Sequence, residues 1–137
     1  MDRPDALSAF KAAPVARLAT VRPNGDPHIV PVTFALIDDT VVTMVDHKPK
    51  KTTRLQRLVN VESNRRVSML VDRYNENWAQ LWWVRLDGLA SIHTDDQVWS
   101  DGRDALAAKY AQYRNRQPEG PAISIEIEAV ASWASTP

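Results

Sequence analysis

The sequence alternates between short apolar runs of β-strand type and polar turns. Residues 15–21 are mostly apolar, and residues 28–36 form a second such run after a polar segment that contains Asn24 and Gly25. Asn-Gly between two apolar runs is a strong hairpin signal, because both residues accept the backbone angles of a tight turn. The pattern therefore predicts that the first two strands form an antiparallel hairpin.

Four further runs have β-strand character, and the longest of them contains one glycine. Gly88 interrupts residues 81–92, and a glycine inside a strand is typical of a bend. Together with the hairpin, these runs predict six strands, at residues 15–21, 28–36, 41–45, 67–71, 81–92 and 122–130.

Three stretches have apolar residues at the spacing of a helix. The first covers residues 5–13, and the third covers residues 101–113. The second ends at Asn64, and we expect Thr52 or Thr53 to be its N-cap because their hydroxyls can accept from free backbone N–H groups. All three helices are short compared with the strand content.

The order of these elements predicts a mainly β protein of the α+β class. Strands that follow one another in hairpin order, with few helices between them, favour an antiparallel β-barrel with short peripheral helices. The length of 137 residues indicates a single domain over residues 1–137. With only four glycines, the sequence contains neither a dinucleotide fingerprint nor a P-loop.

Charge and composition narrow the classes of function. Seventeen basic residues balance seventeen acidic ones, so the chain has no general attraction for nucleic acid or membrane surfaces. The absence of cysteine excludes disulfides, thiolate metal sites and cysteine nucleophiles. Because no signal-type or membrane-spanning apolar run is present, we expect a cytoplasmic protein.

Positive charge is nevertheless concentrated around residue 50. Seven of the residues from 48 to 66 are basic, and Glu62 is the one acid among them. Lysine and arginine side chains, threonine hydroxyls and a helix N-terminus together suit a phosphate or carboxylate. The segment is therefore either an anion clamp or a solvated helix face, and the clamp would consist of Lys50, Lys51, Thr52, Thr53 and Arg54.

Three tryptophans lie close together near the longest predicted strand. Trp82 and Trp83 are consecutive in that strand, so their side chains point to opposite faces, and Trp78 precedes them. One face can be barrel core. The other needs cover from a partner subunit or a flat ligand, unless simple packing accounts for both tryptophans.

Two prolines interrupt the second strand of the hairpin. Pro27 and Pro31 lack a backbone N–H group, so the strand around Val30 and Val32 has an incomplete hydrogen-bond ladder. Its backbone could meet the edge of a ligand, or the prolines could simply mark the margin of a sheet. His28 is either a structural residue or a proton donor near that ligand.

The ordered segments resemble a known family. The hairpin ARLATVRPNGDPHIVPV, the run DHKPKKTTRLQRL followed by NRRVSMLVD, and the stretch YNENWAQLWWVRLDG are similar to the split β-barrel flavin and deazaflavin oxidoreductases. These form the pyridoxamine-phosphate-oxidase-like superfamily, and the likeness is to its F420-dependent branch. It covers residues 6–133 and implies a six-stranded, FMN-binding-like split barrel that forms a homodimer with two cofactor sites at the interface.

The resemblance also implies roles for individual residues. Basic residues around the helix after the third strand would bind the cofactor phosphate, and backbone of the second strand would meet the ring system. A tryptophan would approach from the other subunit, and metal ions would have no role. The matching positions are Lys50, Lys51, Thr52, Thr53 and Arg54 for phosphate, Val30, Pro31 and Val32 for the ring, and Trp78 for the partner's tryptophan.

These implications lead to a specific prediction of function. The protein would transfer a hydride between reduced coenzyme F420 and a small conjugated organic substrate. Such chemistry belongs to the cofactor, which explains why the sequence shows no nucleophile–base arrangement. Two alternatives remain: the same fold with FMN, and a non-enzymatic barrel that stores a cofactor or binds single-stranded nucleic acid, although zero net charge argues against nucleic acid.

Overall fold

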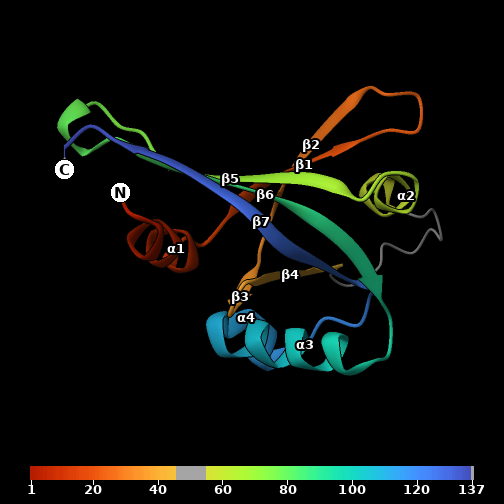
Figure 1. Cartoon of the computed structure of the whole chain (residues 1–137). Helices are drawn as coiled ribbons and strands as arrows, with labels where there is room; N and C mark the ends of the chain where they lie inside the picture. The colour runs from red at the N-terminus through yellow and green to blue at the C-terminus, as the bar shows by residue number, and fades with distance from the viewer. Residues whose placement is uncertain (46–54, 137) are drawn as a thin grey trace.

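A computed structural model describes residues 1–45 and 55–136 and shows one strongly curved antiparallel sheet (Figure 1). Its seven strands have the order β2-β1-β5-β6-β7-β4-β3. The strands are β1 (Ala16–Val21), β2 (Pro27–Val32), β3 (Ala35–Ile37), β4 (Thr40–Met44), β5 (Arg66–Arg73), β6 (Trp82–His93) and β7 (Ala122–Ala134). The helices are α1 (Arg3–Ala12), α2 (Gln56–Ser63), the 3-10 turn η1 (Trp78–Gln80), α3 (Gln97–Lys109) and α4 (Ala111–Asn115).

The sheet curls because its two edge strands are neighbours in the chain. β2 lies at one edge and β3 at the other, yet only Thr33 and Phe34 connect them. A flat seven-stranded sheet cannot be spanned by two residues, so the two edges must approach each other at this corner. The result is the split-barrel architecture that the sequence predicted.

The predicted count of six strands was wrong, because residues 28–36 form two strands rather than one. At the corner, the Phe34 side chain is fully buried, and its ring centroid lies 4.8 Å from that of Phe10. The Thr43 hydroxyl donates to the carbonyl oxygen of Thr33 at 2.7 Å. The Tyr110 hydroxyl lies 3.2 Å from both the backbone nitrogen and the carbonyl oxygen of Phe34. These tertiary contacts replace the ladder bonds that a continuous strand would have made.

Helices seal the interior of the barrel and cover part of its exterior. α1 and α2 each contribute buried side chains, Phe10 and Leu58 among them, to the main core enclosed by the sheet. α3 and α4 pack on the outside of β3 and β4 (Figure 1), where Leu106 and Tyr113 meet Val42 in a second cluster. No helix in the described part of the chain is long and apolar enough to cross a membrane.

The helix starts differ from the sequence prediction. α2 begins at Gln56 with Leu55 as its N-cap, so the predicted caps at Thr52 or Thr53 were wrong, and Arg54 precedes the helix. α3 begins at Gln97, earlier than expected, because the Asp96 carboxylate accepts from a backbone N–H of the first turn. Asn64 ends α2 as predicted.

The predicted irregularity at Gly88 is present as a bulge between β6 and β7. Asp87 pairs with Ala129, and Gly88 pairs with Ile127, so Glu128 is an extra residue on β7. A Cβ atom at Gly88 would lie 2.2 Å from the carbonyl oxygen of Glu126. Only glycine fits this position without a backbone shift, because no heavy atom tolerates so short a contact.

Candidate functional site

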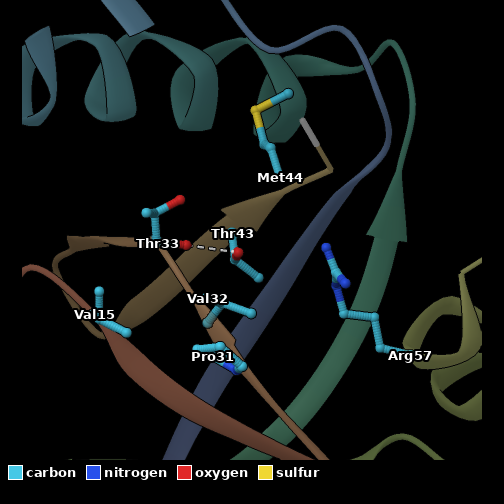
Figure 2. Close-up of a pocket in the computed structure, with 7 residues that line it drawn as sticks. All are labelled: Val15, Pro31, Val32, Thr33, Thr43, Met44 and Arg57. Atoms are coloured by element: carbon cyan, nitrogen blue, oxygen red, sulfur yellow. Dashed lines mark hydrogen bonds between the residues drawn. The ribbon is translucent and has the colours of Figure 1, made fainter. Parts of the chain in front are cut away.

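A pocket lies where edge strand β2 faces the start of α2, and we call it the edge pocket. Its volume is about 210 Å³. Figure 2 shows that its walls come from the end of β2 and the following corner, from β4 and from the first turn of α2. The lining residues are Val15, Pro31, Val32, Thr33, Thr43, Met44 and Arg57.

One wall of the edge pocket consists of sheet-edge backbone. β2 pairs with β1 on one side only, so half of its backbone groups point away from the sheet. Pro31 and Val32, two of the three residues expected to meet a cofactor ring, line the pocket. Val30 does not, because its partly buried side chain packs against the barrel core.

Among the described residues that line the edge pocket, the cation is Arg57. Its side chain projects from the first turn of α2 toward the pocket (Figure 2). That first turn contains no acidic residue, and Leu55 offers no side-chain cap. An arginine beside the positive end of a helix dipole is unfavourable by about 0.3–1 kcal/mol, so an anion at this position would be stabilised modestly.

Sequence reasoning counted Arg57 among the basic residues but did not select it. The predicted helix start gave the first-turn position to Arg54, whereas the structure gives it to Arg57. The signal that could have found it is Leu55, an apolar residue that anchors the helix start against the core. Five predicted phosphate ligands lie outside the described residues: Lys50, Lys51, Thr52, Thr53 and Arg54.

The position of that basic segment in the chain is nevertheless informative. Residues 46–54 connect β4 to α2, and both elements supply lining residues to the edge pocket, Met44 and Arg57. The described elements on either side of the segment therefore both contribute to the pocket wall.

Hydroxyl groups hold the corner that closes the edge pocket. The Thr33 hydroxyl shares a hydrogen bond of 2.7 Å with the hydroxyl of Tyr113, which lies on α4. Nearby, the ammonium of Lys109 lies 3.7 Å from the centroid of the Phe34 ring and donates to the carbonyl oxygen of Ala13 at 2.7 Å. Burial lowers the pKa of Lys109 to about 8. These contacts tie the α3–α4 pair to the corner.

His28 and Trp78 do not line the edge pocket. His28 is half-buried on β2, opposite Thr20, and its Nδ1 atom is buried without a hydrogen-bond partner among the described residues. Trp78 lies in η1 and is 76% exposed. The structure therefore places neither the predicted proton donor nor Trp78 in the lining of the edge pocket.

The paired tryptophans face opposite sides of β6, as predicted. Trp82 packs against the barrel core. Trp83 lies on the outer face opposite Trp133 of β7, which is 41% exposed. Ile29, on the same outer face of β2, is 63% exposed. This face carries apolar side chains that a single copy of the chain leaves open to water.

A second polar arrangement links α3 to the sheet. His93 Nδ1 lies 2.6 Å from an Asp96 carboxylate oxygen, and His93 Nε2 lies 2.9 Å from the Ser124 hydroxyl. The hydrogen bond from His93 lowers the pKa of the Asp96 carboxyl. Although the order of groups is that of a hydrolytic triad, Ser124 lies where β7 pairs with both β4 and β6, so the backbone N–H groups around it form ladder hydrogen bonds. This arrangement fastens the start of α3 rather than forming a nucleophile site.

Metal ligation has no support in the described residues, which contain no cluster of three histidine, aspartate or glutamate side chains suited to a metal ion.

Solved structures share this fold across nearly the whole chain. A conserved hypothetical protein from Mycobacterium tuberculosis has 19% identity and a TM-score of 0.80, over 98% of this chain and 86% of that one. A FAD-binding protein from Mesorhizobium loti has 21% identity and a TM-score of 0.74, over 96% and 94%. A putative 5-nitroimidazole antibiotic resistance protein from Bacteroides thetaiotaomicron has 12% identity and a TM-score of 0.75, over 96% and 82%.

No curated protein matches the sequence closely enough to assign an activity. The family model for pyridoxamine 5'-phosphate oxidase, however, matches residues 4–134. The matched residues thus include every strand and all residues that line the edge pocket. The chain belongs to the pyridoxamine 5'-phosphate oxidase family, whose members share a flavin-binding split barrel.

Proposed function

We propose that the edge pocket binds the ring of a deazaflavin and that the protein is an F420-dependent oxidoreductase. It would transfer a hydride between reduced F420 and a small conjugated organic substrate. The observation that carries this proposal is the pairing of sheet-edge backbone at Pro31 and Val32 with the cation of Arg57 across one pocket. Family membership supports a flavin-type cofactor, and the sequence resemblance favours the deazaflavin.

The lining of the edge pocket fits a flat redox ring. Such a ring needs apolar contact on its faces and hydrogen-bonding groups at its edge. Val15 and Met44 supply apolar surface, the β2 edge supplies backbone groups, and Arg57 supplies a donor with positive charge. The phosphate-bearing tail would then extend toward the lysines of the basic segment, Lys50 and Lys51, with Thr52, Thr53 and Arg54 as further donors.

The size of the edge pocket supports a homodimer. Its volume of about 210 Å³ is below the roughly 300–1,000 Å³ of typical ligand sites. A ring seated there would remain partly open to water unless another surface covered it. Trp78, which is largely exposed, would provide that cover from the partner subunit, and the outer face around Trp83 and Trp133 would form the contact between subunits.

In this proposal the protein holds and orients the cofactor and supplies no reactive group of its own. The cofactor supplies the hydride chemistry when bound. Arg57 would orient the ring and balance negative charge, Pro31 and Val32 would fix the depth of the ring edge, and the partner subunit would exclude water. The proton donor is left unassigned, since His28 lies away from the pocket lining.

FMN is the second candidate cofactor, because a structural relative is a FAD-binding protein. The two cofactors can be distinguished by titrating the purified protein with F420 and with FMN and measuring the quenching of fluorescence. We expect saturable quenching of F420 with one site per chain and weaker binding of FMN. Tighter binding of FMN would transfer the proposal to flavin, and binding of neither would refute a redox cofactor at this site.

Activity needs a separate measurement. The protein loaded with reduced F420 should oxidise it in the presence of conjugated enones or nitroaromatic compounds. The readout is the increase in absorbance as oxidised F420 forms. Tight binding with no turnover across such a panel would instead indicate a cofactor-storage protein.

A further inference from the structure

The outer face of the sheet contains a second pocket, larger than the edge pocket and sharing no lining residue with it. We call it the outer-face pocket, and its volume is about 370 Å³. Strands β1, β5, β6 and β7 and the start of β2 form its walls. The lining residues are Ala19, Thr20, Val21, Pro27, Arg66, Val67, Ser68, Asp87, Gly88 and Glu128.

The β-bulge places a carboxylate at this pocket. Glu128 is the extra residue on β7, and it faces outward beside Ala129, so two consecutive residues of β7 are exposed at the bulge. The close approach of the β7 backbone to Gly88 makes this arrangement possible, since any larger residue there would meet the Glu126 carbonyl oxygen.

The charged groups of the pocket fall into two kinds. Asp87 is fully engaged, because it accepts from the Ser68 hydroxyl at 2.6 Å and from the Arg85 guanidinium. Glu128 and Arg66 are held loosely, with 3.7 Å between a carboxylate oxygen and a guanidinium nitrogen, and their side chains are 48% and 77% exposed. An exposed ion pair at that separation contributes little to stability, so both groups can turn to a ligand at small cost.

Apart from these charged groups and the hydroxyl-bearing residues Thr20 and Ser68, the lining of the pocket is apolar. Ala19, Val21 and Pro27 are all on the outer face of the β1–β2 hairpin, and they form a floor beside the two charged groups. A ligand that suits this surface has a hydrophobic body and carries both a positive and a negative group at one end.

We propose that the outer-face pocket binds a small zwitterion of the α-amino-acid class with an apolar side chain. Its ammonium pairs with Glu128 and its carboxylate with Arg66, while the side chain lies on Ala19, Val21 and Pro27. The two charges of an α-amino acid are attached to the same carbon atom, which matches a cation and an anion held 3.7 Å apart. A zwitterion with a long spacer between its charges does not match this separation. The proposal does not depend on the cofactor of the edge pocket, and it requires that the subunit contact proposed at Trp83 and Trp133 leave Asp87, Gly88 and the β1–β2 hairpin uncovered.

The test is NMR titration of the full-length protein, with the methyl signals of Ala19 and Val21 as reporters. The probes are leucine, isopentylamine, 4-methylpentanoate and 6-aminohexanoate, which represent the zwitterion, the amine alone, the acid alone and the long zwitterion. We expect saturable shifts with leucine and binding at least about tenfold weaker with the other three probes. The amine and the acid each lack one charge-assisted contact, and the charges of 6-aminohexanoate have a long spacer between them.

Variants locate the site. Glu128→Gln and Arg66→Gln should each weaken leucine binding about tenfold, whereas Glu126→Gln, two residues away on the same strand, should leave it unchanged. If no probe binds, or if the amine or the acid binds as tightly as leucine, the proposal is overturned. Leucine binding that survives both Glu128→Gln and Arg66→Gln would overturn it equally.

Discussion

Replacing Arg57 with glutamine tests the edge pocket most directly. The change removes the positive charge from the pocket wall and keeps a side chain of similar length. A hydrogen bond to a charged group contributes about 1.5–3 kcal/mol, which corresponds to roughly a tenfold to 150-fold change in a dissociation constant. Because the pocket is open to water and Arg57 is only half-buried, the low end applies, and we expect cofactor affinity to fall about tenfold.

Loss of folding should not account for that effect. Arg57 lies in the first turn of α2, where a cation opposes the helix dipole by about 0.3–1 kcal/mol. Its removal relieves this repulsion but also removes an interaction that Arg57 makes within the chain. Because these two effects oppose each other, the melting temperature of Arg57→Gln should stay close to that of the unchanged protein. Arg57→Lys, which keeps the charge without the planar guanidinium, should recover part of the affinity.

The assay is equilibrium fluorescence quenching with F420 and, in parallel, with FMN. Arg66→Gln is the matched control, because it removes one exposed positive charge from a residue outside the edge pocket. Unchanged affinity in a folded Arg57→Gln variant, or an equal loss in Arg66→Gln, would refute the assignment of Arg57 to the ligand.

Three further outcomes are expected. Changing Lys50 and Lys51 together to alanine should weaken F420 binding roughly tenfold or more, and a folded double variant with unaltered quenching would remove them from the phosphate site. Trp83→Ser should shift the protein toward monomer in sedimentation, and persistence of a dimer would exclude Trp83 from the contact. Burial lowers the pKa of Lys109 from 10.5 to about 8, so the folded state binds fewer protons than the unfolded state between these values, and stability should rise with pH across that window. Urea unfolding of Lys109→Met should lack this rise, and an identical pH slope would contradict the burial of the charge.

Local chemistry explains what the sequence predicted correctly. The first hairpin depends on residues adjacent in the chain, since Gly25 has a φ of 93° and the Asn24 side chain accepts from the backbone N–H of Asp26 at 3.0 Å. The irregularity at Gly88 was predictable because glycine weakens a strand interior and is found there mainly at bulges and close backbone approaches. The alternation of side chains along a strand likewise assigned Trp82 and Trp83 to opposite faces.

The missed features depend on contacts between distant segments. The corner at Thr33 and Phe34 is set by hydroxyl groups from Tyr110, from α4 and from β4, which no pattern within residues 28–36 reveals. The start of α2 was misplaced because threonine caps are common, whereas here packing of Leu55 against the core fixes the helix start. Glu128 could not be recognised as a bulge residue, since the bulge exists only relative to β6.

The pairing of β7 with β4 also constrains the order in which the sheet forms. β7 is the last strand in the chain, and it pairs with both β6 and β4. Until it is in place, β4 has only the three-residue partner β3, and the curved sheet cannot close. Non-local pairings of this kind favour folding over milliseconds to seconds rather than microseconds. Because β4 forms one wall of the edge pocket, that wall is held in place only once β7 has paired with β4, so the ligand site depends on a strand that supplies none of its lining residues.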